Sequence, residues 1–331
     1  MTESAIVKTV GDIELSAELK EINETAKEVI AAASSPSTRR AYAAQWRNFT
    51  AFCERYGLEP LPAKPETVAG YIAYCVKADK SASNINQAIA AIRAAHKRAG
   101  LDNPTESELV KVAAAGARRT VGTAPHKKAA ATEDIIGELV DGLDRTTVQG
   151  KRDAALILLG FWGAFRRSEL VGLDVEDIER AIENGKPALR VTIRRSKTDQ
   201  EGRGMVKAIT TPRKKGLNPI SALDNYLNAA GIASGPVFRR VRRGDHVQDE
   251  RLTGRAVALI VQHAAAESGI VLDLAGHSLR SGFITSALAA GISERAVMNQ
   301  SGHKSVTVMR GYEQRATAFQ DNAAVELAKK I

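Results

Sequence analysis

The sequence predicts a mainly α-helical fold with a small antiparallel β-sheet, divided between two domains. Three observations lead to this prediction. Apolar residues recur at helical spacing through most of the chain, two short segments alternate between polar and apolar residues, and a stretch containing Gly, Pro and basic residues separates two apolar regions. A chain of 331 residues is also long enough for two domains, each with its own core.

The first domain is predicted over residues 20–119 and consists of helices. Residues 1–19 are polar and acidic, and we expect them to form a flexible tail. A first helix over 20–33 is rich in alanine and glutamate. A second helix follows, for which Ser37 and Thr38 offer an N-cap. This helix ends at Gly57. Its apolar face is formed by residues at helical spacing, Tyr42, Trp46, Phe49 and Cys53.

Three further helices complete this domain. The third begins near Pro65, which suits a first-turn position. The fourth covers about 84–99 and directs isoleucines inward, with a basic far end that contains Arg93, His96, Lys97 and Arg98. The fifth opens with the capping-box pattern Thr105-x-x-Glu108. Charges on one helix are as consistent with a solvated face as with a binding surface.

A basic linker is predicted at 120–131, and a second domain at 132–331. Thr132 is the expected N-cap of its first helix. A strongly apolar helix is expected over 151–163, and the alternating segments 189–193 and 205–210 predict two strands joined by a polar, hairpin-like turn. The remaining predicted helices cover 219–230, 253–268, 278–290, 293–300 and an amphipathic C-terminal segment at 316–331.

Composition restricts the possible partners and the compartment. A net charge of +9 and a pI of about 9.5 favour a polyanionic partner such as nucleic acid, although a basic protein without such a partner would look the same. Cys53 and Cys75 lie among apolar helical positions, which indicates buried free thiols. Neither a signal peptide nor an apolar run of about 18 residues is evident, so we expect a cytoplasmic protein with no membrane partner.

Six polar residues of the second domain have the chemistry required for phosphoryl transfer without a metal or other cofactor. They are Arg166, Lys197, His277, Arg280, His303 and Tyr312. Cationic donors can hold a phosphate and its developing charge, and a tyrosine can attack it and hold a covalent intermediate. Glu169 could fix the guanidinium of Arg166 or a neighbouring histidine. Arg167 competes with Arg166 for the same role, because adjacent helical residues point about 100° apart.

Taken one at a time, these positions are weak signals. Lys197 alone would be an exposed turn lysine, and Arg166 with Glu169 would be an ordinary helical ion pair. His277 and Arg280 share a face only if a helix begins there. His303 could be a loop histidine and Tyr312 a half-buried packing residue. Their joint order and spacing is what supports a shared site.

The ordered motifs resemble those of the tyrosine recombinase (phage integrase) family, and most closely the Cre-type recombinases. They are Phe165-Arg-Arg-Ser-Glu-Leu-Val-Gly-Leu173, Arg195-Ser-Lys-Thr198, Gly276-His-Ser-Leu-Arg-Ser-Gly282, Ser301-Gly-His303 and Gly311-Tyr312. The resemblance covers nearly the whole chain, beginning with Ser37-Thr-Arg-Arg-Ala-Tyr42. One difference from Cre is visible, because His303 stands where Cre has tryptophan.

The resemblance implies a role for each residue. Tyr312 would attack the scissile phosphate to leave a 3′-phosphotyrosine and a free 5′-hydroxyl. Arg166 and Arg280 would hold the non-bridging oxygens together with His303. Lys197 would protonate the leaving oxygen, His277 would assist near the nucleophile, and Glu169 would give structural support.

The family fold implies a two-domain clamp on double-stranded DNA that carries an inverted-repeat site. The C-terminal helix at 316–331 would dock on a neighbouring protomer to make a homotetramer on two sites, or else fold back on its own domain. The expected location is cytoplasmic and nucleoid-associated. The candidate DNA contacts are Arg39, Arg40, Arg93, Lys97, Lys127, Lys128, Arg239, Arg240, Arg242 and Arg243, the last four in a loop.

Two other functions use the same residues. A type IB topoisomerase-like enzyme would share the nucleophile and the cations but relax supercoils as a monomer. A catalytically silent DNA-binding protein would keep the fold without cleavage. The helical first domain, the short chain and the C-terminal tail favour the recombinase over the topoisomerase, and the presence of all six polar positions argues against the silent protein.

Overall fold

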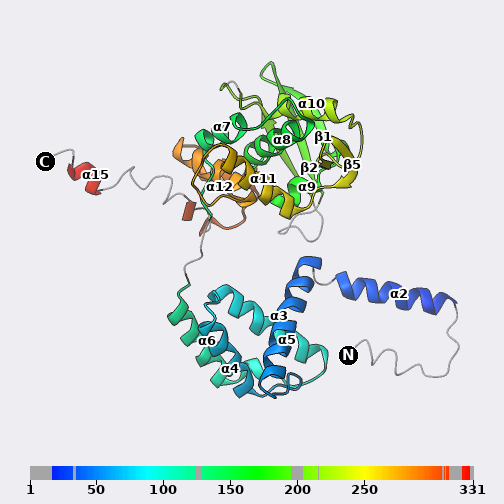
Figure 1. Cartoon of the computed structure of the whole chain (residues 1–331), viewed down its shortest axis with the longest axis vertical. Helices are drawn as coiled ribbons and strands as arrows, with labels where there is room; N and C mark the ends of the chain where they lie inside the picture. The colour runs from blue at the N-terminus through cyan, green and yellow to red at the C-terminus, as the bar shows by residue number, and fades with distance from the viewer. Residues whose placement is uncertain are drawn as a thin grey trace. The chain divides into compact units, whose positions relative to one another are not determined.

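The computed structural model describes the chain as two compact units, Met1–His126 and Lys127–Ile331. Within them the described residues are 17–32, 35–123, 128–194, 204–214, 216–307, 309, 311–312 and 323–328. Most of these residues are helical (Figure 1). The described residues of the first unit form helices and no strand, whereas those of the second combine helices with two small antiparallel sheets. The predicted fold class is therefore confirmed.

Four helices of this unit, between residues 36 and 121, pack as a bundle (Figure 1), and the bundle core is aromatic and aliphatic. Phe49, Cys53, Ile72 and Ile92 are buried in it, as their helical spacing predicts. Both cysteines are buried free thiols. The elements are α2 (Ala17–Ala32), α3 (Pro36–Arg55), α4 (Pro65–Lys77), α5 (Ala82–Arg98), the 3₁₀ helix η1 (Pro104–Glu106) and α6 (Glu108–Val121).

Two predicted helix starts are wrong. The N-cap of α3 is Ser35, whose Oγ accepts from the Thr38 backbone N–H at 3.2 Å, because Pro36 occupies the first helical position. The expected capping box at Thr105 is replaced by the short helix η1, which Asn103 caps. Asn103 Oδ1 accepts from both the backbone N–H and the hydroxyl of Thr105, so the Thr105 side chain does not cap a longer helix.

His96 does not belong to the basic end of α5, where the sequence placed it. The side chain is fully buried, with Nδ1 2.9 Å from the Ile92 carbonyl and Nε2 accepting from the Ala63 backbone N–H at 2.9 Å. The imidazole therefore ties the loop before α4 to α5. Arg93 and Lys97 remain exposed, and Arg93 donates to the Thr105 hydroxyl.

The second unit is organised around α8 (Val148–Trp162), which is buried along most of its length. Helices α7 (Glu133–Asp141), α10 (Pro219–Ala230), α11 (Gly254–Glu267) and α12 (Gly276–Ala289) pack against it (Figure 1). Their ranges agree with the predicted helices within a few residues. The shorter helices are α9 (Arg167–Gly172), η2 (Val175–Asp177), α13 (Glu294–Ser301) and α15 (Ala323–Ala328).

A three-stranded sheet lies beside these helices, in the order β1-β2-β3. The predicted strands are β2 (Lys186–Ile193) and β3 (Met205–Thr210), which pair antiparallel with Leu189 opposite Ile209. The sequence did not predict β1 (Ile178–Glu183), which has no apolar alternation and keeps most of its side chains exposed.

A second, two-stranded sheet corrects one predicted loop. Arg239, Arg240 and Arg242 lie on β4 (Arg239–Arg242), which pairs with β5 (His246–Arg251). Both strands are polar, so neither carries the apolar alternation by which a strand is recognised in sequence.

The end of the predicted linker packs against α12. Ala131 is buried, and its N–H donates to the Ser278 carbonyl at 3.0 Å. The chain passes so close to Gly282 that a Cβ there would lie 1.7 Å from the Ala131 carbonyl oxygen. A glycine is thus required for residues 128–131 to reach the helix that carries two of the candidate site residues.

We expect Gly282→Ala to destabilise this unit by about 1–3 kcal/mol, because its Cβ displaces backbone rather than a flexible side chain. Urea unfolding measures the difference. Gly137→Ala is the matched control, because the nearest atom to its Cβ is 4.0 Å away. Equal stability of the two variants would contradict this account of the contact.

No described helix is long and apolar enough to cross a membrane. Of the predicted C-terminal helix at 316–331, only α15 at Ala323–Ala328 falls within the described residues.

Candidate active site

The turn between α8 and α9 forms one side of the site. Gly163 ends α8, and a Cβ at that position would lie 2.1 Å from the ring of Phe165. Ala164 follows with a left-handed φ of 46°, an uncommon conformation for a residue with a side chain. Such strain persists only where the surroundings fix it, and it is frequent at functional sites. Here it directs the Ala164 carbonyl toward Arg280, which donates to it at 2.7 Å.

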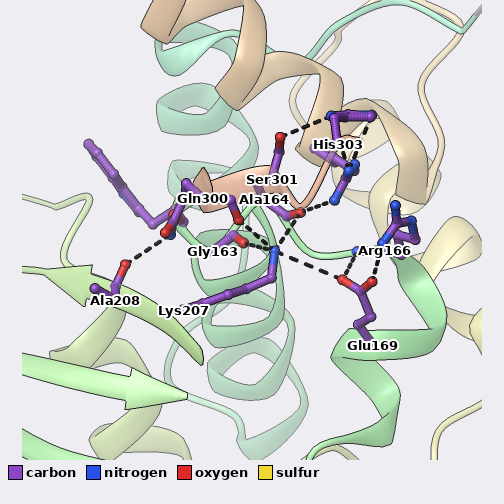
Figure 2. Close-up of polar contacts among 11 residues, drawn as sticks. Gly163, Ala164, Arg166, Glu169, Lys207, Ala208, Gln300, Ser301 and His303 are labelled. Atoms are coloured by element: carbon purple, nitrogen blue, oxygen red, sulfur yellow. Dashed lines mark hydrogen bonds and ion pairs between the residues drawn. The ribbon is translucent and has the colours of Figure 1, made fainter. Parts of the chain in front are cut away.

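Arg166 comes directly after this turn and is the N-cap of α9. Its Nη1 donates to Glu169 Oε1 at 2.6 Å, and its backbone N–H donates to Glu169 Oε2 at 2.9 Å. The Glu169 side chain is almost fully buried, so it fixes both the guanidinium and the backbone of Arg166 (Figure 2). Arg167 is exposed, and its side chain lies across Gly276.

Helix α12 places His277 and Arg280 one turn apart at its N-terminal end. Arg280 is among the largest fully buried side chains of the described chain. Its Nη2 lies 3.2 Å from Nε2 and 3.3 Å from Nδ1 of His303, and donates to whichever ring nitrogen carries no proton. Ser301 Oγ lies 2.9 Å from His303 Nδ1 and gives the ring a second polar contact (Figure 2).

His303 follows the C-terminus of α13, where Gly302 adopts a left-handed φ of 70°. A Cβ on Gly302 would lie 2.9 Å from Met205 Sδ, so strand β3 and the His303 segment approach closely. The sequence motif Ser-Gly-His therefore has a structural reason: Ser301 orients the ring, and Gly302 allows both the turn and the contact.

Tyr312 completes the cluster. Its hydroxyl lies 3.3 Å from His277 Nε2, and its ring centroid lies 6.0 Å from that of His303. The same ring packs against a small apolar cluster that includes Met309 and Ile284. The Tyr312 ring is thus held by apolar contacts, while its hydroxyl lies beside His277.

The charges in this cluster are unbalanced in favour of cations. Burial, followed by the charges of Arg280 and Arg166, lowers the pKa of His303 to about 4. Burial and the neighbouring arginines also lower the pKa of His277. The pKa of Arg280 falls to about 10 through burial and the charge of Arg166. Such a site favours an anion, because a negative group would compensate several cations at once.

Sequence reasoning missed one residue of the cluster, Lys207 on β3. Its side chain is 1% exposed, and Nζ lies 3.9 Å from Glu169 Oε2 (Figure 2). Burial lowers the pKa of this amine to about 7, although the Glu169 charge raises it. A signal was present in the sequence, because Lys207 shares the inward phase of β3 with Met205 and Ile209. A lysine at an inward strand position is rarely buried without a partner.

The structure thus brings together five of the six candidate catalytic residues, with Glu169 beside them. Lys197 lies within 195–203, outside the described residues; β2 ends at Ile193 before this segment and β3 begins at Met205 after it. In the parts of the chain that the structure describes, no cluster of three or more His, Cys, Asp or Glu side chains is arranged to hold a metal ion.

The candidate DNA contacts fall into different environments. Arg39 lines a groove of about 800 Å³ between α3 and α5, together with Arg47 and Arg98, which the sequence analysis did not select. Lys97 and Arg40 are exposed in the same unit. The second-unit candidates Arg240, Arg242 and Arg243 are also exposed.

Among the second-unit candidates, Lys128 and Arg239 have partners within the protein, and Lys127 cannot be placed. Lys128 Nζ lies 2.5 Å from Asp273 Oδ1. Arg239 donates to Asp249, Ser234 and Pro236, so its guanidinium is held by its own hairpin region. Lys127 lies outside the described residues.

Comparison with known proteins decides the family. The phage integrase family matches residues 130–318, and its N-terminal SAM-like domain matches residues 27–100. The chain belongs to the phage integrase family. It is a tyrosine recombinase, an enzyme of DNA strand breakage and rejoining.

Named relatives of this recombinase agree with that assignment. The integrase/recombinase xerD homolog of Selenomonas ruminantium is 34% identical over 92% of this chain and 89% of its own length. The recombinase cre of Escherichia phage P1 is 26% identical over 80% of each chain. The expected likeness to Cre is therefore present, but the xerD homolog is the more similar of the two.

Solved structures share the fold. A lambda integrase dimer bound to a COC′ core site has a TM-score of 0.60 at 16% identity, and covers 94% of this recombinase and 84% of that chain. The XerH site-specific recombinase in a post-cleavage complex has a TM-score of 0.53 at 16% identity, over 80% of this chain and 72% of that chain.

The lowered pKa of His303 predicts an acid-sensitive recombinase. Because the folded pKa of about 4 lies below the ordinary value of 6.5, the unfolded chain binds more protons between these values. Stability contributed by neutral His303 is therefore present above pH 6.5 and lost as the pH falls toward 4. Chemical unfolding at several pH values should show that the free energy of unfolding falls less on acidification in His303→Gln than in the wild type. His246→Gln, at an exposed position, is the matched control. The prediction is contradicted if His303→Gln loses as much unfolding free energy on acidification as the wild type.

Proposed function

We propose that this enzyme is a site-specific recombinase that cleaves and rejoins DNA through a 3′-phosphotyrosine intermediate at Tyr312. One observation carries the proposal: the Tyr312 hydroxyl lies beside His277, in a cluster where Arg280 contacts His303 and Arg166 adds a further cation. A nucleophile next to a titratable group and several cationic donors is the arrangement that phosphoryl transfer requires.

The proposed reaction begins with attack of Tyr312 Oη on the scissile phosphorus. The tyrosine–phosphorus bond forms, the bond to the 5′ oxygen breaks, and that oxygen takes a proton. Lys197 supplies this proton, and His277 accepts or orients the phenolic proton at 3.3 Å. Rejoining is the reverse reaction with a new 5′-hydroxyl. Because the phosphotyrosine keeps the energy of the phosphodiester, the exchange requires no ATP.

Arg166, Arg280 and His303 stabilise the phosphate during this step. Two guanidinium groups can each donate in a planar fork to non-bridging oxygens. Glu169 keeps Arg166 in place through its side-chain and backbone contacts. An incoming phosphate supplies the negative charge that this cation-rich cluster lacks, and it favours protonation of His303.

Affinity for double-stranded DNA comes from basic residues of both units. The candidates are the exposed Arg40, Lys97, Arg240, Arg242 and Arg243, and Arg39, Arg47 and Arg98 along the groove of the helical unit. Lysine and arginine contacts to phosphates release counterions, so affinity should fall steeply with salt. The target is an inverted repeat, and two such sites are held by a homotetramer in which residues 316–331 contact a neighbouring protomer.

A trapped intermediate tests this function. The substrate is a duplex that carries the inverted repeats flanking the chain's own gene, nicked just 3′ of the suspected cleavage phosphate so that rejoining fails. A denaturing gel then detects a covalent protein–DNA adduct, and peptide mapping locates the linkage. An adduct at Tyr312 supports the proposal. Tight footprinting without an adduct would instead favour a DNA-binding protein that does not cleave.

A second readout separates recombination from supercoil relaxation. Two labelled sites on separate duplexes should yield recombinant products and a complex of four protomers on native gels. Relaxation of plasmid by a monomer, with no exchange between sites, would overturn the tetrameric part of the proposal.

A further inference from the structure

The Lys207 ammonium lies at the meeting point of three segments (Figure 2). It donates to the Gly163 carbonyl at 2.7 Å, to the Ala164 carbonyl at 3.2 Å and to the Gln300 carbonyl at 2.9 Å. Gly163 and Ala164 form the turn that precedes Arg166, whereas Gln300 lies in the last turn of α13, next to Ser301 and close to His303. The lysine itself lies on β3, which begins just after the segment that contains Lys197.

Two of these contacts lead to residues of the proposed phosphate site. The Ala164 carbonyl accepts from both Lys207 and Arg280, at 3.2 and 2.7 Å, so one oxygen fixes two cations. Ser301 adjoins the Gln300 carbonyl and orients His303. Moving the ammonium would therefore disturb the orientation of Arg280 and His303 together.

The Gln300 side chain forms a second connection between the same segments. Its Nε2 donates to the Trp162 carbonyl at 3.0 Å and to the Ala208 carbonyl at 2.9 Å. The end of α8, the end of α13 and strand β3 are thus joined by two neighbouring side chains, Lys207 and Gln300. We call these two residues and their five carbonyl contacts the brace.

The geometry also excludes one role for Lys207. An ammonium has three N–H donors, and three backbone carbonyls occupy all of them. With all three N–H groups donated to these carbonyls, the amine has no N–H left to direct at a leaving oxygen. Lys207 is therefore not a second candidate for the proton donor that the proposed function assigns to Lys197.

Burial of this cation has an energetic cost that packing alone does not explain. The nearby charges of Arg280 and Arg166 add to the effect of burial in lowering the pKa of Lys207, and Glu169 opposes them. A methionine would fill a similar volume without carrying a charge among other cations. Such a cost is consistent with a role in the site rather than in stability.

We propose that Lys207 is a positioning residue of the recombination site, whose ammonium holds the Gly163–Ala164 turn and the end of α13 so that Arg280 and His303 converge on one phosphate. The inference rests on the proposed function. Strand β3 follows the segment that contains Lys197, and the proposal gives the strand a second role, because its Lys207 fixes the phosphate-binding groups. Misplacement of such groups by about 1 Å can reduce a rate about 100-fold.

The test compares Lys207→Met with Lys197→Ala on two nicked substrates in single-turnover cleavage. One substrate has oxygen at the 5′-bridging position and the other has sulfur, whose thiolate leaves without a proton. Lys186→Met, at an exposed position on β2 of the same sheet, is the matched control. DNA affinity is measured in parallel.

We expect Lys207→Met to cleave the oxygen substrate about 100-fold more slowly, with unchanged affinity, and the sulfur substrate to show the same deficit. Lys197→Ala should regain most of its rate with sulfur. Cleavage of the oxygen substrate by Lys207→Met at the wild-type rate would overturn the proposal. Full restoration of its rate with the sulfur substrate would also overturn it, because Lys207 would then be the proton donor. Failure of the proposed function is distinguishable, since the wild type itself would then form no adduct.

A second variant covers the case in which Lys207→Met does not fold. Gln300→Ala removes the other half of the brace and leaves the buried charge in place. We expect it to reduce cleavage about 10-fold without weakening DNA binding, because one half of the brace remains. If Lys207→Met does not fold and Gln300→Ala cleaves at the wild-type rate, the proposal is contradicted.

Discussion

Replacement of Tyr312 by phenylalanine is expected to abolish the covalent protein–DNA adduct and to leave DNA affinity unchanged. The substitution removes only Oη, which lies 3.3 Å from His277 Nε2. The phenylalanine ring keeps the apolar contacts with the cluster around Met309. Without the phenolic oxygen, no other group can form the phosphotyrosine.

The measurement is a denaturing gel of wild type and variant on the nicked duplex, with binding followed at several salt concentrations. The slope of affinity against salt should be equal for both proteins, because no phosphate-binding cation is removed. Tyr74→Phe is the control, since Tyr74 is a partly exposed tyrosine of the helical unit. An adduct that survives Tyr312→Phe would show that another residue is the nucleophile.

Replacement of Arg280 by lysine is expected to reduce cleavage about 100- to 1,000-fold, the cost of removing one well-placed donor from an anion-binding site. The guanidinium reaches two targets at once, the Ala164 carbonyl through Nη1 and the His303 ring through Nη2. A lysine keeps the charge but cannot donate in this fork geometry.

Single-turnover cleavage measures the effect, with affinity and thermal unfolding determined for the same protein. Because the charge is retained, the salt dependence of binding should remain that of the wild type. Arg255→Lys, on the exposed face of α11, provides the matched control. A cleavage rate within a few-fold of the wild type would mean that charge alone, and not the fork, is what the site requires from Arg280.

The order of the helices and the central strand pair could be predicted because local spacing encodes them. The apolar stripe of α3 and the alternation in β2 and β3 are properties of neighbouring residues, and burial against any core produces them. Strands β1, β4 and β5 were missed because they are mostly polar and exposed. These strands pair through backbone hydrogen bonds, and the pattern of side chains along the sequence does not predict such bonds.

The candidate site was accessible from sequence for a different reason. Arg166, His277 and Tyr312 stand in short motifs whose residue types are chemically unusual together, so they could be selected without knowledge of their distances. The sequence could not decide between Arg166 and Arg167. The structure separates their positions: Arg166 is fixed by buried Glu169, whereas Arg167 is exposed across Gly276.

The sequence by itself thus determined the fold class, the succession of helices and the set of candidate site residues, because each depends on local pattern and residue chemistry. Only the tertiary structure decided the burial of His96 and the carbonyl contacts of Lys207, because their partners lie far away in the sequence. The partners of Lys207 lie 44 and 93 residues away, and Arg280 donates to a carbonyl 116 residues away. The burial and pKa of such side chains depend on groups that only folding brings near, and no local pattern contains them.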